Sequence, residues 1–99
     1  MLNLGSVVTL GVDLHHAPAG AKGVVVEVYN RHEMADNTGW FILFDNGFAD
    51  GFSAFDLEHL KVHDTGEVDQ VIRRYRFTNV SRLHQEYLDG WFDLALGKR

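Results

Sequence analysis

The fold is decided by the stretch that begins Gly23-Val24-Val25-Val26-Glu27-Val28-Tyr29 and continues, after a polar loop, as Trp40-Phe41-Ile42-Leu43-Phe44-Asp45-Asn46-Gly47-Phe48. Both parts are rich in β-branched and aromatic residues, which favour strands. The Asn46-Gly47 pair is typical of a tight hairpin turn. We therefore predict strands over 24–29 and 40–44 and a return strand over 48–53.

The flanking segments complete a small barrel in this interpretation. A β-branched run bounded by glycines predicts a first strand over 6–10, and Asp56-Leu57-Glu58 predicts one turn of 3₁₀-helix over 54–59 before a last strand over 60–63. The expected fold class is mainly β with C-terminal α (α+β). It is a five-stranded barrel over 6–63 followed by a helical extension over 64–97, in one domain 1–99.

After Val62 the apolar spacing changes. Asp64 and Glu67 resemble an N-terminal capping pair, and the apolar residues that follow have helical spacing, namely Val68, Val71, Ile72 and Tyr75. The alternative is that 75–77 is extended and only a later helix forms, so helix and strand both stay open for 67–77. The later helix should begin near Asn79 and stop at Gly97, with Gly90 inside it costing about 1 kcal/mol relative to alanine.

Composition sets the broad class. The chain has 99 residues, 45% of them apolar and 23% charged, and it has no cysteine. These values indicate a folded protein without disulfides or a thiolate metal site. No run approaches the roughly 18 apolar residues of a membrane span, and no secretory signal is visible, so we expect a cytoplasmic protein. We predict no cofactor, no metal and no membrane partner.

Charge is distributed unevenly. Residues 1–64 carry three Lys or Arg against nine carboxylates, whereas residues 65–99 carry six against five. The acidic barrel half is a poor partner for nucleic acid, which is bound by neutralising phosphates. A cationic small molecule or a basic peptide suits it better. The basic run Arg73, Arg74 and Arg76 could contact phosphates, but a solvated helix face explains it more simply.

The pattern resembles the SH3-like small barrels as a class. The residues that carry the resemblance are Gly23-Val24-Val25-Val26, Phe44-Asp45-Asn46-Gly47 and Asp56-Leu57-Glu58, which are similar to patterns in Tudor and KOW barrels. This resemblance covers about 6–63 and implies an SH3-like fold. A compact chain with a helical tail is also similar to uncharacterised proteins carried on bacterial integron gene cassettes.

Aromatic and acidic residues suggest a ligand site at the barrel mouth. Aromatic rings attract cations, and neighbouring carboxylates add to the attraction. The candidate ligand-binding residues are Tyr29, Trp40, Asp45, Phe48, Asp50 and Phe52. The simpler alternative is that most of these rings fill the core or a subunit interface. His59 and His63 have the spacing of a metal pair on a helix, but a turn followed by a strand would hold them too far apart for one ion.

Bulky residues on both faces of the strand at 40–44 require two covers. Trp40 and Ile42 point to one face and Phe41 and Leu43 to the other, and each large side chain left wet forfeits about 1.5–3 kcal/mol. The C-terminal helix can supply one cover and a second copy of the chain the other, which predicts a homodimer or higher oligomer. The candidate interface residues are Phe41, Leu43, Leu88, Trp91 and Phe92.

The sequence thus predicts a non-catalytic binding or interaction domain that associates with itself. The alternative is a small oligomeric enzyme with a site at the subunit junction, an architecture similar to the plasmid-type dihydrofolate reductase. That enzyme has a Val-Gln-Ile-Tyr segment where this chain has Phe-Ala-Asp-Gly-Phe-Ser at 48–53, so the catalytic motif is missing. Nucleic-acid binding through residues 73–82 is a third interpretation.

Overall fold

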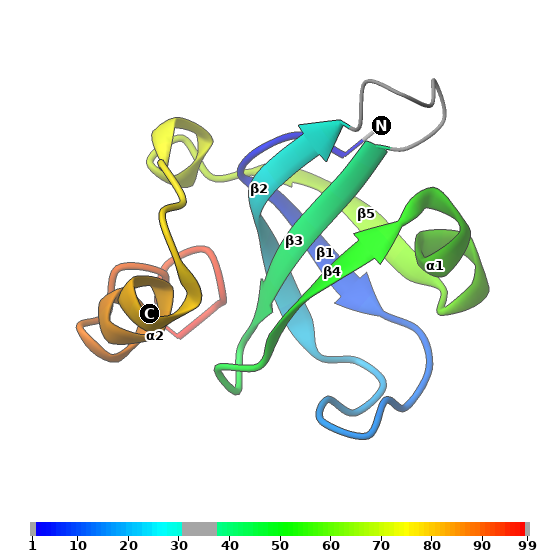
Figure 1. Ribbon diagram of the computed structural model, residues 1–99. Helices are drawn as coiled ribbons and strands as arrows, with labels where there is room; N and C mark the ends of the chain where they lie inside the picture. The colour runs from blue at the N-terminus through cyan, green and yellow to red at the C-terminus, as the bar shows by residue number, and fades with distance from the viewer. Residues whose placement is uncertain (1, 31–37, 99) are drawn as a thin grey trace.

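The computed structural model describes residues 2–30 and 38–98. Within these residues five strands form one antiparallel sheet, and three helical segments accompany it (Figure 1). The strands are β1 (Ser6–Leu10), β2 (Lys22–Asn30), β3 (Thr38–Phe44), β4 (Ala49–Ser53) and β5 (Val62–Val68). The helical segments are α1 (Ala54–His59), the 3₁₀-helix η1 (Ile72–Arg74) and α2 (Val80–Leu88).

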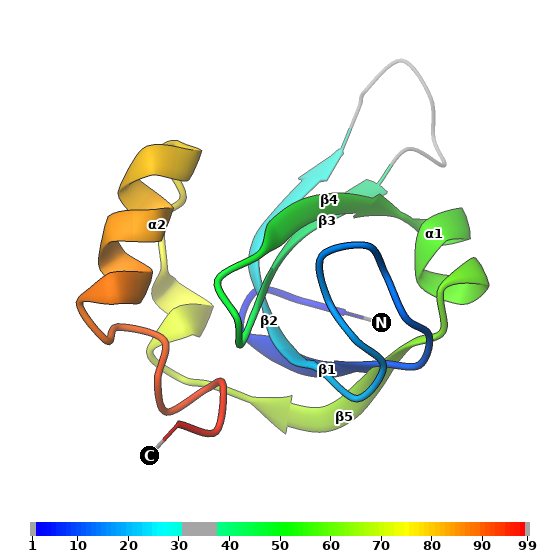
Figure 2. The same cartoon turned by 90° about the horizontal axis from the view of Figure 1, so that it is seen from below.

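The sheet has the order β4-β3-β2-β1-β5, so β4 and β5 are its two edges. It curves strongly, and α1 lies beside the gap between the edges, while α2 lies on the opposite side of the sheet (Figure 2). The predicted class, mainly β with a C-terminal helix, is confirmed. The predicted closure into a barrel is wrong, because β4 and β5 do not pair and the chain passes between them through α1.

The hairpin between β3 and β4 forms where Asn46-Gly47 predicts it. Gly47 has φ of +90°, and its N–H donates to the Phe44 carbonyl at 3.0 Å. The Phe44 N–H donates in turn to the Phe48 carbonyl at 2.8 Å. This is a three-residue loop with glycine in the left-handed position, which a residue with a Cβ enters only under strain.

Two separate cores cover the two faces of the sheet, and both are built from this one chain, so the second copy that the sequence suggested as a cover for β3 is not needed there. The inner core is built from Leu2, Val8, Leu10, Ala17, Ala21, Val25, Trp40, Ile42, Phe44 and Phe52. The outer core is built from Val24, Val26, Leu43, Ile72, Leu83, Phe92, Ala95 and Leu96. The outer face is therefore covered by the chain's own C-terminal part, from η1 onward.

The inner core is closed by the N-terminus and by the segment between β1 and β2. The Trp40 indole donates from Nε1 to the Leu2 carbonyl at 2.9 Å. Ala17 and Ala21 are buried, and Leu14 packs against the same core. Figure 2 shows this segment folded across the concave side of the sheet. The long loop between β1 and β2 therefore closes one side of the inner core.

The 54–59 turn is an α-helix rather than the predicted 3₁₀-turn. Ser53 Oγ accepts from the Asp56 N–H, and the Asp56 carboxylate accepts from the Ser53 N–H. This reciprocal capping box satisfies two amides of the first turn. α1 buries none of its own residues completely.

The prediction of a helix directly after Val62 is wrong. The structure agrees with the alternative, in which the chain is extended at Tyr75 and the later helix forms. β5 runs to Val68 because it pairs with β1, with Asp64 opposite Val8 and Val68 opposite Ser6. Asp69 Oδ1 then accepts from the N–H groups of residues 71 and 72 and starts η1. Tyr75, at ψ of 141°, is extended.

α2 begins where the sequence predicts and ends earlier. Asn79 Oδ1 accepts from the Arg82 N–H at 2.8 Å, the expected N-cap. Gly90, at φ of +86°, ends the helix: its N–H donates to the Tyr87 carbonyl and that of Trp91 to the Glu86 carbonyl. This Schellman arrangement redirects the chain. The predicted continuation to Gly97 is therefore wrong, and 91–97 consists of separate turns.

Candidate functional site

The predicted ligand-binding aromatics do not meet around one cavity. Trp40 and Phe52 are 5% and 4% exposed and face each other across β3 and β4 in the inner core. Phe48 is half-buried against the same core, and its ring stacks on Phe44 at 6.1 Å between centroids. These three rings fill the inner core, in agreement with the simpler alternative that the rings are core residues.

Tyr29 lies apart from those rings, on the outer face. A Cβ built on Gly39 would approach its ring carbon Cε2 to 2.2 Å, and one built on Gly51 would approach its hydroxyl to 2.8 Å. Tyr29 is 40% exposed, so its ring covers two glycines and shows one face to solvent. The two faces of the sheet thus separate Tyr29 from Trp40.

The two candidate carboxylates bond to nearby backbone. Asp45 Oδ2 accepts from the Lys22 N–H at 3.2 Å, and the Asp45 carbonyl accepts from the Tyr87 hydroxyl at 2.8 Å. Asp50 is exposed, and its Oδ1 accepts from the N–H of Gly51 at 2.8 Å. Asp45 therefore connects the hairpin to β2 and to α2, whereas within the described residues the Asp50 side chain bonds to the amide of Gly51 alone.

The predicted interface residues divide into two groups. Leu43 and Phe92 are 1% and 0% exposed and lie in the outer core, and Phe41 is half-buried against Phe77 with 5.1 Å between ring centroids. Leu88 and Trp91 point to solvent, at 62% and 57% exposed. Self-association itself stays a prediction.

Several apolar side chains near the C-terminus are exposed to solvent. After Gly90 the turns bury 92, 95 and 96 and expose Trp91 and Leu94, the latter 67% exposed. Val71, 69% exposed, lines one cavity together with Trp91. We call Val71, Leu88, Trp91 and Leu94 the C-terminal apolar strip. The sequence analysis missed Val71 and Leu94 as surface residues, although the helix-breaking Gly90 signals a change of exposed face.

The cavity beside the strip is basic. It has a volume of about 230 Å³ and is lined by Val71, Ile72, Arg74, Tyr75, Arg76, Arg82, Glu86 and Trp91. Arg82 Nε lies 3.8 Å from Glu86 Oε2. Among the described residues, Arg74 and Arg76 have no carboxylate within ion-pair distance. Two guanidinium groups thus stand beside Trp91 without a counterion from the described chain.

A tyrosine and a carboxylate form the inner wall of this cavity. The Tyr75 hydroxyl donates to Glu86 Oε1 at 2.6 Å, and Glu86 is only 8% exposed. Burial raises the pKa of Tyr75 well above its ordinary value, and the hydrogen bond to the Glu86 carboxylate adds to the rise. The tyrosine therefore stays protonated and serves as a structural donor.

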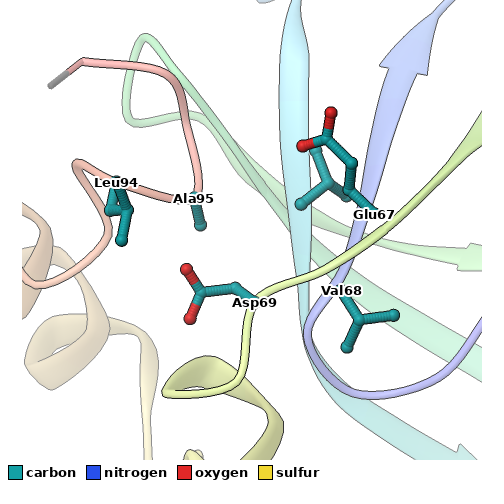
Figure 3. A pocket seen from close by; sticks show the side chains of 6 residues that line it. Glu67, Val68, Asp69, Leu94 and Ala95 are labelled. Atoms are coloured by element: carbon teal, nitrogen blue, oxygen red, sulfur yellow. The ribbon is translucent and has the colours of Figure 1, made fainter.

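A notch lies at the other end of the strip, between the end of β5 and the turn that carries Leu94 (Figure 3). It is about 190 Å³ and is lined by Val7, Glu67, Val68, Asp69, Leu94 and Ala95. In Figure 3 the Asp69 carboxylate points toward Leu94 and Ala95. Glu67 is exposed, so this end of the strip is acidic.

Another cavity, of about 400 Å³, lies at α1 and is lined by Phe55, Glu58, His59 and Lys61. The Phe55 and His59 rings stack with centroids 5.3 Å apart. All four side chains are exposed, so no lining group is held in a desolvated position. We see no arrangement there that would fix a ligand.

Metal-ligating groups do not gather in residues 2–30 and 38–98: no three His, Asp or Glu side chains there could hold one ion. His15 and His16 contact each other edge-on at 4.4 Å, and the nearby Asp13 accepts from the Ala19 N–H. His32 and Arg31 lie outside the described residues, as does most of the predicted exposed loop at 30–39.

Comparison with known proteins yields no relative. No family model, no curated protein and no solved structure that we compared with the chain matches it. In the part of the chain that the structure describes, no helix is long and apolar enough to cross a membrane. Function must therefore be inferred from the surface of the chain itself.

Proposed function

We propose that the protein is a non-catalytic interaction domain that associates with itself through the C-terminal apolar strip. The observation that carries the proposal is the exposure of Trp91, Leu88 and Leu94, at 57%, 62% and 67%. The same C-terminal part of the chain contributes Phe92, Ala95 and Leu96 to the outer core. Val71 and Trp91 line one cavity, and exposed apolar side chains that lie together in this way are typical of interaction sites.

The energetics favour covering this strip. Burying a Leu or Val side chain gains about 1.5–3 kcal/mol relative to leaving it wet. Trp and Arg are enriched among the residues that dominate binding, and Trp91 and Arg74 both line this cavity. The strip is also held rigidly, because Phe92 and Leu96 anchor the same turns in the outer core, so little ordering entropy is lost on association.

The cationic ligand predicted from the sequence is not part of this proposal. It was based on a shared aromatic cage and on the acidic charge of residues 1–64. The opposite faces occupied by Tyr29 and Trp40 remove the first of these two arguments.

We also propose that the open sheet is a variant of the SH3-like barrel. What supports this is the succession of β1 to β4 as neighbouring antiparallel strands, followed by a short helix and the return of β5 beside β1. Such folds serve many unrelated functions, so the proposal for self-association rests on the strip and not on the fold.

Light scattering coupled to gel filtration tests self-association. Wild type should elute with a mass above that of one chain at high loading and decline toward 11.2 kDa on dilution. Trp91→Ser should stay at the mass of one chain. The matched control is Phe55→Ser, which removes an aromatic residue that is 71% exposed on α1; it should behave as wild type. Equal masses for all three proteins would contradict the proposal.

A further inference from the structure

The two ends of the C-terminal apolar strip carry opposite charge. Arg74 and Arg76 line the cavity that contains Trp91. Glu67 lines the notch that contains Leu94. The strip therefore runs from a basic end, past exposed apolar side chains, to an acidic end.

The fold fixes this order, because two segments lie alongside each other in opposite chain directions. Residue 67 shares the notch with residue 94, and residue 71 shares the cavity with residue 91. Farther on, Tyr75 bonds to Glu86 and its ring contacts that of Phe92 at 5.3 Å. Charges that are seven to nine residues apart in sequence are thus held at opposite ends of one surface.

Local structure explains why the basic side chains face outward. Tyr75 is extended and turns its ring into the outer core, so its neighbours Arg74 and Arg76 are both exposed. At the other end, Glu67 lies in the edge strand β5 and is exposed. Asp69 is engaged differently, since its Oδ1 accepts two amides at the start of η1.

These charges lack partners within the described chain. Arg82 and Glu86 form an ion pair, but Glu67, Arg74 and Arg76 each lie more than 4.0 Å from any oppositely charged group of the described residues. Unpaired charges beside exposed apolar residues are suited to forming ion pairs across an interface. Such pairs determine the orientation of the two partners and the rate of their association.

We infer that a second copy of the chain binds to the strip in antiparallel orientation about a two-fold axis between Trp91 and Leu94, midway between the basic cavity and the acidic notch. In this dimer Glu67 faces the partner subunit's Arg74 and the partner subunit's Arg76, and the reverse pairing repeats on the other side of the axis. The inference rests on the proposed self-association and adds its orientation. A second copy is the occupant because a two-fold axis makes this surface complementary to itself.

The parallel arrangement is disfavoured by the same charges. It would set Arg74 and Arg76 against their own copies and Glu67 against its own copy. Like charges brought together at an interface oppose binding. The apolar residues provide affinity, and the charged ends select the antiparallel orientation.

Charge reversal tests the orientation. Glu67→Lys alone should raise the dimer dissociation constant about tenfold, because the new lysine faces arginines, and Arg74→Glu with Arg76→Glu should do the same. Mixed in equal amounts, the two variants should form a heterodimer with an affinity within about threefold of wild type, since both contacts are again between opposite charges. Glu58→Lys on α1 is the matched control and should leave the dissociation constant unchanged.

Sedimentation velocity of each variant and of the mixture provides the readout, with circular dichroism to confirm that each variant is folded. If the variants weaken the dimer and the mixture does not restore it, or if neither variant weakens it, the antiparallel orientation is overturned while self-association stands. If wild type itself remains monomeric, the proposed self-association fails and the orientation fails with it.

Discussion

The Tyr75 hydroxyl donates a hydrogen bond of 2.6 Å to Glu86 Oε1 and so joins the extended segment after η1 to α2. Glu86 is one of the few buried polar residues of the described chain. Burying a carboxylate lowers the free energy of unfolding unless the carboxylate is hydrogen-bonded. This contact therefore holds the C-terminal part together, independently of the apolar contacts on the sheet.

Tyr75→Phe should lower the free energy of unfolding by about 1–3 kcal/mol, because it leaves a buried acceptor without its donor. Urea denaturation followed by circular dichroism measures the change. Tyr29→Phe is the matched control: Tyr29 is 40% exposed, and its substitution should change stability by less than about 0.5 kcal/mol. Equal effects of the two substitutions would show that the bond to Glu86 contributes nothing.

Alkaline pH should destabilise the protein through Tyr75. Its pKa is raised in the folded state by burial and then by Glu86, whereas an unfolded tyrosine ionises near pH 10. Above about pH 10 the unfolded chain therefore releases a proton that the folded chain retains, and stability falls as the pH rises. Urea midpoints measured across this range should decline less steeply in Tyr75→Phe than in wild type. Parallel declines would contradict the assignment.

Neighbouring residues 91 and 92 should respond in opposite ways to truncation. Phe92 is 0% exposed in the outer core, so Phe92→Ala should cost about 3–5 kcal/mol of stability. Trp91→Ala should have little effect on the stability of the monomer, because that side chain is largely exposed. Thermal unfolding at low concentration, where association is negligible, makes the comparison. Similar losses at both positions would mean that Trp91 is a core residue.

Tyr29 and Gly39 should show strong coupling. A Cβ at position 39 would overlap the Tyr29 ring, with Cε2 only 2.2 Å away. Gly39→Ala should therefore destabilise the protein by about 1–3 kcal/mol, the usual cost of overpacking. In a Tyr29→Ala background the same substitution should cost much less. A double-mutant cycle by urea denaturation gives the coupling, and additive effects would contradict the placement of the ring.

Several features of the fold could be predicted because their signals are local. The alternation of large side chains along residues 40–44 indicates two covered faces, and the structure provides two cores. Asn46-Gly47 and Asn79 signal a turn and a helix start through the conformations that those residues favour. Such signals need no knowledge of distant partners.

The rest depends on contacts between distant residues. Val68, Val71 and Tyr75 have helical spacing. However, the segment from Asp64 to Val68 pairs with the edge of β1, and this pairing makes it a strand. The rings predicted to share one ligand site are divided between the two faces of the sheet for a similar reason. A register shift between Val25 and Glu27 in β2 is not visible in the sequence, although it helps decide where Tyr29 lies.

The exposed strip was only half predictable. The interface predicted from the sequence includes Leu88 and Trp91, and both are exposed. It also includes Phe92, a core residue, because the apolar spacing predicts a helix that continues past Gly90. The left-handed conformation of Gly90 breaks that periodicity and exposes Trp91 and Leu94 together.

Sedimentation equilibrium of the wild-type protein over a range of concentrations tests the central claim most directly. The apparent mass should rise with concentration from 11.2 kDa toward twice that value, because two copies cover each other's apolar strip. An apparent mass of 11.2 kDa at every concentration, up to the highest micromolar loading, would contradict the account.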